Sequence, residues 1–275
     1  MAQTFAQPFV KWAGGKRRLA ENIFQLMPTS FDRYVEPFVG GGAIALRLGE
    51  TPMLLNDANQ ELIRAYEVVR DNVQLLAKLL DKHFALHSRE YYYSVRSQEV
   101  SGLSSAAGAA RLIYLNKAGF NGLYRVNRQG QFNVPFGRQA RLSLYDAENL
   151  SRASTSLKGA MLFALDYATF LRAHVRKGDV VYLDPPYQPI GKYADFRRYT
   201  QHQFREAEQI VLAHIYDELI EIGAYPILSN SHTPFVTKLY AKHNIVTLDV
   251  SRQISGKVSG RANVREVLIT PKVCR

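Results

Sequence analysis

The sequence predicts an α/β fold: a doubly wound, Rossmann-like sheet interrupted by a mainly helical insertion that contains a β-hairpin. Short apolar runs typical of buried strands alternate with helical patterns near both ends of the 275-residue chain. A glycine triplet follows the first of these strands. Between about residues 88 and 150 the alternation stops, which indicates an insertion rather than two domains in tandem.

Periodicity and helix-breaking residues define the N-terminal elements. Residues 16–27, KRRLAENIFQLM, have the apolar spacing of a helix that ends before Pro28. RYVEP and GGAIALRL then indicate a strand, a glycine loop and a helix, and MLLND indicates a second strand. From Ala58 a long amphipathic pattern predicts one helix, or two that break near Asp71 and Asn72.

The insertion is dense in small, amide and aromatic residues. Within it, LYRVN and QFNVPF flank RQG, which is typical of a hairpin. We expect one domain built from residues 1–57 and 155–275, with residues 58–154 inserted into it as a second domain. After the insertion the sequence predicts the strands AMLFALD and GDVVYLD, the helix FREAEQIVLAHIYDELIEIG, and the strands AYPILSN, NIVTLDV and VREVLIT.

Composition limits the partners. The chain has 35 Lys and Arg against 24 Asp and Glu, a net charge of +11, which favours a polyanionic partner. Cys274 is the one cysteine, so no intramolecular disulfide forms, which suits a reducing compartment. No stretch of about 18 residues is continuously apolar, and the first residues lack the pattern of a secretory signal. We therefore expect a cytoplasmic protein with no membrane partner.

The glycine loop favours a nucleoside-bearing cofactor. Gly40, Gly41 and Gly42 stand where a strand turns, so backbone can approach a bound group that a side chain would block. Asp57 follows 17 residues after Gly40, where a carboxylate can accept hydrogen bonds from ribose. The stretch GGGAIA lacks the third glycine of a GxGxxG fingerprint, which argues against a nicotinamide cofactor.

The stretch VVYLDPPY allows two interpretations. Proline fixes its own φ and has no backbone donor, so the strand must end there in a rigid turn. Alternatively, Asp184 is held at the carboxyl end of a buried strand, where open α/β sheets bind ligands. Taken alone, the motif favours the turn.

Three motifs in fixed order, PFVKWAGGKRRL, VEPFVGGGAIAL and VVYLDPPY, resemble those of the amino-methyltransferases that act on DNA bases and use S-adenosylmethionine. LNKAGFNGLYRVNRQGQFNVPFG and the later ILSNSH and VREVLI are similar to segments of the Dam-type DNA adenine methyltransferases. That group places its target-recognition domain between the glycine loop and DPPY. The resemblance therefore implies a methyltransferase sheet that binds S-adenosylmethionine, with residues 58–154 recognising DNA.

The same resemblance implies a set of cofactor-binding residues. Trp12, Lys16, Phe38 and Gly40 would surround the methionine part of the cofactor. By themselves, Trp12 is as typical of a core aromatic, and Lys16 of a solvated helix start. The other implied contacts are Asp57 with the ribose, Asp166 with the adenine, and Asp184.

The DPPY motif suits transfer of a methyl group to an exocyclic amine. Such an amine is a poor nucleophile because its lone pair is delocalised into the base. If Asp184 and the carbonyl of Pro185 accept its two hydrogens, the lone pair turns toward the methyl group. Pro186 stiffens this geometry, and Tyr187 stacks on a base flipped out of the duplex. No separate strong base is needed, since the proton can leave after the methyl arrives.

The segment from Lys117 to Arg128 is basic and aromatic, a composition as typical of a solvated loop as of a DNA contact. The resemblance implies that Phe120 wedges between bases and Arg125 reads a guanine. Asn121 and Lys11 would contact the DNA backbone. The implied contacts also include Leu123, Arg138 near an outer base pair, and Gln139. Phe120 and Gln139 stand where relatives commonly have Tyr, so readout of the outer pair is less defined than readout by Arg125.

Two remaining features carry less information. Residues 252–265, RQISGKVSGRANVR, predict a basic loop that closes over DNA or an ordinary surface loop. His83 and His87 are four apart, but two ligands without a third, and no HExxH motif, predict no metal site. We expect a monomer or weak dimer on double-stranded DNA.

The expected function is site-specific DNA adenine-N6 methylation, with GATC as the target. Cytosine-N4 methylation of DNA and adenine-N6 methylation of RNA share this chemistry and stay open. Two alternatives come from other classes. Intact Asp184 and Tyr187 argue against a catalytically silent DNA-binding protein, and the missing third glycine argues against a nicotinamide-dependent oxidoreductase.

Overall fold

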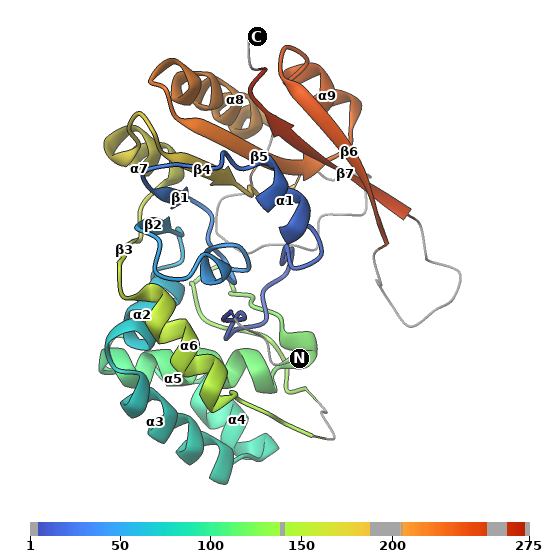
Figure 1. The fold of residues 1–275 in the computed structure, drawn as a ribbon. Helices are drawn as coiled ribbons and strands as arrows, with labels where there is room; N and C mark the ends of the chain where they lie inside the picture. The colour runs from blue at the N-terminus through green and yellow to red at the C-terminus, as the bar shows by residue number, and fades with distance from the viewer. Residues whose placement is uncertain (1–4, 138–140, 188–203, 205, 252–262, 273–275) are drawn as a thin grey trace.

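In the computed structural model, residues 5–137, 141–187, 204, 206–251 and 263–272 are described. They form a seven-stranded sheet with the order β3-β2-β1-β4-β5-β7-β6 (Figure 1). The strands are β1 (Tyr34–Glu36), β2 (Met53–Asn56), β3 (Ala160–Phe163), β4 (Val180–Leu183), β5 (Tyr225–Ser231), β6 (Asn244–Ser251) and β7 (Asn263–Thr270).

Strand β1 is where the winding of the sheet reverses. It pairs in parallel with β2 on one side and with β4 on the other. Parallel strands β3 and β5 extend the sheet beyond β2 and β4, whereas β7 runs antiparallel between β5 and β6. Open α/β sheets bind ligands outside the carboxyl ends of the strands at such a reversal. The predicted doubly wound sheet is confirmed.

Alternate residues of the central strands enter two separate hydrophobic clusters, as the two-residue period of a strand requires. Tyr34 and Tyr182 join one cluster, and Val35 and Val181 join the other. Burial on both faces explains why these strands are continuous apolar runs in the sequence. Helices α1 (Ala20–Leu26) and α2 (Gln60–Asp71) pack into the first cluster, and α7 (Tyr167–His174), α8 (Glu206–Glu221) and α9 (Pro234–Leu239) into the second.

A cluster of helices lies at the end of the molecule opposite α8 and α9 (Figure 1). Its central helix is α5 (Ser105–Ala118), which is buried on nearly all sides and contacts α2, α3 (Val73–Ala85) and α4 (Arg89–Arg96). Helix α6 (Ala147–Leu157) leads from the cluster back to β3. The predicted division into two domains stays a prediction, and its second boundary, at residues 154 and 155, falls within α6.

Most predicted elements are present. The amphipathic segment is two helices, the second of the two predicted alternatives, because Asn72 leaves the helical conformation with φ −138°. Two elements differ from the prediction. The first helix begins at Ala20 rather than at residue 16. The helix predicted after the glycine loop is wrong: only a single 3-10 turn forms, η1 (Ala45–Arg47). Gly42 keeps a positive φ of 68°, which prevents a helix from starting at the glycines.

The predicted hairpin pairs in isolated bridges rather than in strands. Val126 pairs with Phe132 and Gly119 with Phe136, both antiparallel. A second 3-10 turn, η2 (Phe120–Gly122), precedes the hairpin. Within the part of the chain that the structure describes, no helix is both long and apolar enough to cross a membrane.

Candidate active site at the carboxyl edge of the sheet

The glycine loop after β1 is shaped by contacts with two aromatic side chains. Gly40 and Gly42 have φ values of 48° and 68°, in the left-handed region. A Cβ on Gly40 would lie 2.7 Å from Cδ1 of Trp12, and one on Gly42 would lie 2.4 Å from the hydroxyl of Tyr66. The Tyr66 hydroxyl also donates to the carbonyl of Gly40 at 3.0 Å. Glycine is therefore required here because Trp12 and Tyr66 pack directly on the loop backbone.

Asp57 closes the loop from the end of β2. Its Oδ2 accepts the N–H of Gly40 at 3.0 Å, and its Oδ1 accepts that of Asn59 at 2.9 Å. Burial raises the pKa of Asp57 to about 6, although the two backbone donors oppose this shift. The carboxylate keeps lone pairs for further donors, because each oxygen accepts more than one hydrogen bond.

Asn56, beside Asp57, joins three loops at this edge. Its Nδ2 donates to the carbonyls of Pro37 at 3.0 Å and Leu165 at 3.1 Å, and its Oδ1 accepts the N–H of Leu165 at 2.9 Å. Asn56 is completely buried. One side chain thus fixes the loops that follow β1, β2 and β3 relative to one another.

Asp184 follows β4 directly and is clamped through one oxygen. Its Oδ1 accepts hydrogen bonds from Nζ of Lys16 and from Oγ of Ser229, both at 2.8 Å. Burial raises the pKa of Asp184, and the charge of Lys16 and the two donors oppose that shift. Among the described residues Oδ2 accepts no hydrogen bond.

The carbonyl groups of Pro185 and Pro186 also differ in whether they accept a hydrogen bond. Gln209, on α8, donates through Nε2 to the carbonyl of Pro186 at 3.1 Å, and its Oε1 accepts Nδ2 of Asn230 at 3.0 Å. Within the described ranges the carbonyl of Pro185 receives no donor. At the end of β4, one carboxylate oxygen and one neighbouring carbonyl thus have no donor among the described residues.

Tyr187 completes the motif and is restrained at its hydroxyl. That hydroxyl donates to Oε2 of Glu266, on β7, at 2.8 Å. The ammonium of Lys16 lies 4.4 Å from the ring centroid, over one face. Lys16 thus contacts both Asp184 and Tyr187, which places it at the DPPY motif rather than on a solvated helix.

The segment before Lys16 is fixed to the helical cluster. The buried side chain of Asn116, on α5, accepts the N–H of Lys11 at 2.7 Å and donates to its carbonyl at 2.8 Å. Trp12 stacks on Tyr124 with ring centroids 5.1 Å apart. Trp12 therefore lies between the glycine loop and the insertion, in contact with both.

Two further predicted cofactor residues flank this edge. Phe38 packs against Tyr167 and Phe204, with centroids 5.1 Å and 5.9 Å away. Asp166 caps α7, accepting the N–H groups of Ala168 and Thr169 through Oδ1. The structure thus brings the loops that carry Phe38, Asp57 and Asp166 to one edge of the sheet.

The loop predicted to contact DNA presents its side chains to solvent. Phe120 is 50% exposed, Asn121 is exposed with a φ of 54°, and Leu123 is partly buried. Arg125 is exposed, and Asn133 orients it by accepting Nε at 2.7 Å and Nη2 at 3.0 Å. Arg138 and Gln139, and nearly all of residues 252–265, lie outside the described residues.

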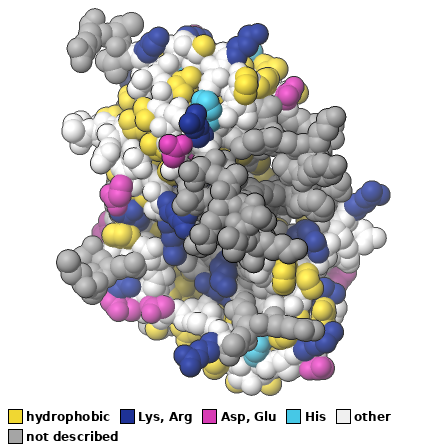
Figure 2. Space-filling model, turned by 90° about the vertical axis from the view of Figure 1, so that its right-hand side faces the viewer, with side chains coloured by type: hydrophobic (Ala, Val, Ile, Leu, Met, Phe, Trp, Pro, Cys, Tyr) yellow, Lys and Arg dark blue, Asp and Glu magenta, His cyan; other side chains and the backbone are white. Residues whose placement is uncertain are grey.

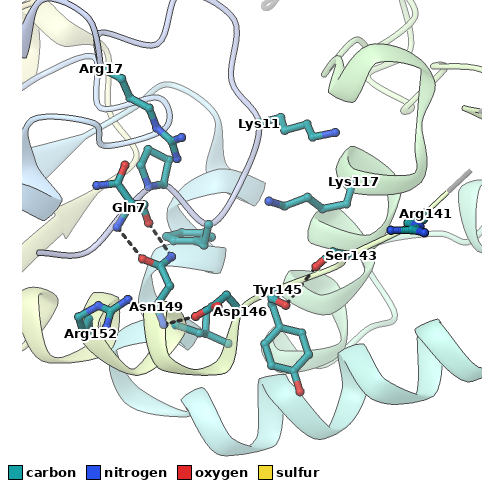
Figure 3. Close-up of a pocket in the computed structure, with 13 residues that line it drawn as sticks. Gln7, Lys11, Arg17, Lys117, Arg141, Ser143, Tyr145, Asp146, Asn149 and Arg152 are labelled. Atoms are coloured by element: carbon teal, nitrogen blue, oxygen red, sulfur yellow. Dashed lines mark hydrogen bonds between the residues drawn. The ribbon is translucent and has the colours of Figure 1, made fainter. Parts of the chain in front are cut away.

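A basic cavity of about 440 Å³ lies beside this loop, between the N-terminal segment, the end of α5 and α6 (Figure 3). Lys11 and Arg17 enter it from one side, and Lys117 points into it from α5. Burial, together with the charges of Lys11 and Arg17, lowers the pKa of Lys117 to about 8. Arg141 and Arg152 also line the cavity. Figure 2 shows Lys and Arg side chains gathered near the middle of one face of the molecule.

Several polar partners of the site were not among the residues predicted from the sequence. A signal was present in β5, where Ser229, Asn230 and Ser231 follow apolar residues in a strand that is almost entirely buried. Such buried polar groups require partners. The partners that were missed are Ser229, Gln209, Asn230, Glu266, Asn116 and Asn133. In the described ranges no three His, Cys, Asp or Glu side chains form a group that could hold a metal ion.

Comparisons with known proteins show which proteins the chain is similar to. The model of the family described as D12 class N6 adenine-specific DNA methyltransferase matches residues 12–254. Over 96% of its length the chain is 36% identical to "Type II methyltransferase M1.LlaDCHI" of Lactococcus lactis subsp. cremoris, covering 95% of that protein. It is 35% identical to "Type II methyltransferase M.MjaIII" of Methanocaldococcus jannaschii, covering 96% of this chain and 98% of that one. The "DNA adenine methylase" of Escherichia coli K12 is 32% identical, with coverage of 94% and 93%.

Substitution of Gly42 tests whether side-chain contact or φ alone demands glycine in the loop. Gly49 is the matched control, because its φ is 66° but a Cβ there would meet nothing within 4 Å. We expect Gly49→Ala to lower the free energy of unfolding by about 1 kcal/mol through strain. Gly42→Ala should lower the free energy of unfolding by ~1–3 kcal/mol more than Gly49→Ala does, because its Cβ would clash with Tyr66. Urea unfolding measures both changes. Adding Tyr66→Phe to Gly42→Ala should restore part of the lost stability. Equal losses of stability at both glycines would show that the contact with Tyr66 is not the reason for glycine at position 42.

Proposed function

Because this chain belongs to the D12 class N6 adenine-specific DNA methyltransferases, we propose that it methylates an adenine flipped out of duplex DNA within a specific site, using S-adenosylmethionine. The observation that carries this proposal is the pair of open acceptors at the end of β4. Oδ2 of Asp184 and the carbonyl of Pro185 belong to neighbouring residues and receive no donor from the described residues. In contrast, Oδ1 of Asp184 and the carbonyl of Pro186 each accept hydrogen bonds.

Two acceptors match the two hydrogens of an exocyclic amine. When both hydrogens are bound, the nitrogen becomes more tetrahedral and its lone pair points away from the ring. The N–C bond forms as the methyl–sulfur bond breaks, and the amine then loses one proton through Asp184 to water. Lys16 and Ser229 favour the ionised form of Asp184, which can accept that hydrogen.

The residues at the carboxyl edge fit the proposed cofactor, whose role is to supply an activated methyl group. The loop at Gly40 has no side chain that would separate Trp12 from its backbone, and Asp57 beside it keeps lone pairs that can accept ribose hydroxyls. Trp12 and Phe38 provide apolar surface near the loop, and Asp166 retains a second carboxylate oxygen beyond the one that caps α7. Gly40 itself contributes through backbone, since Trp12 leaves no room for a side chain.

The exposed loop of the insertion suits a role in opening the duplex. Phe120 has an exposed apolar ring that can enter the base stack beside the target. The extruded base would then stack on the face of Tyr187 that Lys16 does not cover. Asn121 and Leu123 flank Phe120 and would contact the strand that it opens.

Sequence readout and backbone contacts come from basic residues around that loop. Arg125, oriented by Asn133, presents its guanidinium to solvent, as reading a guanine requires. The cavity lined by Lys11, Arg17 and Lys117 provides positive charge for phosphates beside the loop. We propose that residues 58–154 act as the target-recognition domain, that Arg138 and Gln139 contribute to readout of a GATC-like site, and that the protein acts as a monomer or weak dimer.

Nucleoside analysis of DNA incubated with the protein and S-adenosylmethionine tests this function. We expect N6-methyladenine in the wild-type reaction and none with Asp184→Ala, because the variant lacks one of the two acceptors. Binding of the variant to duplex DNA should be largely retained. Methylated cytosine, or no methylated base, in the wild-type reaction would refute the proposal; normal turnover by Asp184→Ala would refute the role of Asp184.

The pKa of about 6 for Asp57 makes cofactor binding depend on pH. Ribose hydroxyls donate to the ionised carboxylate, so bound cofactor lowers that pKa and binding releases a proton near and below pH 6. We expect the affinity for S-adenosylmethionine to fall as the pH decreases from 7 to 5, approaching about tenfold per pH unit once the pH is below 6. Asp57→Asn should bind more weakly with a flatter profile in calorimetry. If the affinity of Asp57→Asn depended on pH as in the wild-type protein, Asp57 would not be the group responsible for the pH dependence.

Arg125→Ala tests base readout. We expect binding to the specific duplex to weaken by about 1–3 kcal/mol, with little change on random duplex. Arg172→Ala is the control, since Arg172 is an exposed arginine on α7 that pairs with Glu218; it should leave both affinities unchanged. Equal losses on the two duplexes with Arg125→Ala would make Arg125 a phosphate contact.

A further inference from the structure

Glu266 is a buried carboxylate whose position relative to the DPPY motif is unusual. It lies on β7, is 5% exposed, and accepts the hydroxyl of Tyr187 at 2.8 Å. In the sheet β5 separates β7 from β4, and Glu266 is opposite Ser231 of β5. Tyr187 therefore crosses the end of β5 to reach a strand two positions away from its own.

The restraints on the backbone of the motif do not by themselves set the plane of the Tyr187 ring. The prolines fix their own φ angles, and Gln209 holds the carbonyl of Pro186. Neither restraint acts on the side-chain torsions of Tyr187. A ring that must present one plane to a base needs a further restraint at its far end, which the hydroxyl contact with Glu266 supplies.

Glu266 is well placed to hold that end. Its strand pairs on both sides, with β5 and with β6, so the carboxylate is attached to a rigid backbone. The pKa of Tyr187 is raised well above its usual value, first by burial and then by Asp184, Tyr182 and Glu266, whereas a hydrogen bond with the side chain of Ser229 lowers it; the phenol stays neutral and keeps its proton to donate. A buried carboxylate also needs a donor, and Tyr187 provides one.

We propose that Glu266 is a positioning residue that presets the plane of the Tyr187 ring for stacking on the target base. The inference rests on the proposed function, in which Tyr187 receives that base. Without Glu266, the ring keeps its contact with Lys16 but loses the hydrogen bond at its hydroxyl, so more of its torsional freedom has to be lost when a base enters. The expected effect is about a three- to tenfold weaker capture of the base, since ordering one side chain costs a factor of this size.

A double-mutant cycle distinguishes positioning from a general structural role. Tyr187→Phe removes the donor and leaves β7 intact, and Glu266→Ala removes the acceptor. Fluorescence of 2-aminopurine at the target position reports base capture, and kcat and KM are measured alongside thermal unfolding. Asp249→Ala is the control, because Asp249 is an exposed acid on β6 that pairs with Arg265, next to Glu266.

We expect each single variant to reduce base capture by about three- to tenfold, and the double variant to be no worse than either. Glu266→Gln, which keeps an acceptor oxygen, should restore most of the capture, and Asp249→Ala should not change it. Losses that multiply in the double variant, or Tyr187→Phe with normal capture, would overturn the inference. If the wild-type protein shows no base capture and no methylation, it is the proposed function that fails.

Discussion

The ion pair between Lys16 and Asp184 joins the N-terminal segment to the end of β4, and much of the site depends on it. Both side chains are largely withdrawn from water, so each would be costly to bury without the other. Trp12, on the same segment, packs against the glycine loop and Tyr124. Asn116 holds the start of the segment at Lys11. One short segment thus connects the glycine loop, the DPPY motif and the insertion.

Charge is arranged in two zones around this segment. Buried carboxylates, including Glu36, Asp57, Asp184 and Glu266, lie at the carboxyl edge of the sheet. Burial raises the pKa of Glu36 well above its usual value. Lysine and arginine side chains instead line the cavity beside the exposed loop. The positive charge that the proposed polyanionic ligand requires therefore lies in the second zone, apart from the buried carboxyl groups.

The sequence predicted the elements whose signals are local, and it could not predict the partners that folding brings together. Strands such as β4 are continuous apolar runs, and the position of Asp184 at a strand end followed from the prolines after it. Helix α5 gave no helical periodicity because it is buried on nearly all sides. Ser229 lies 45 residues after Asp184, and Glu266 lies 79 residues after Tyr187, so they meet the motif only through the strand order. The role of Lys16 at Asp184 was hidden for the same reason.

In the proposed function, the acceptor pair at the end of β4 does not by itself select adenine. Oδ2 of Asp184 and the carbonyl of Pro185 match any exocyclic amine, including that of cytosine. Selection for the larger base would then come from the surface on which it stacks. Under the proposal that surface is the ring of Tyr187, and Lys16 and Glu266 contact its face and its hydroxyl. The plane of this ring would then affect substrate choice as well as base capture.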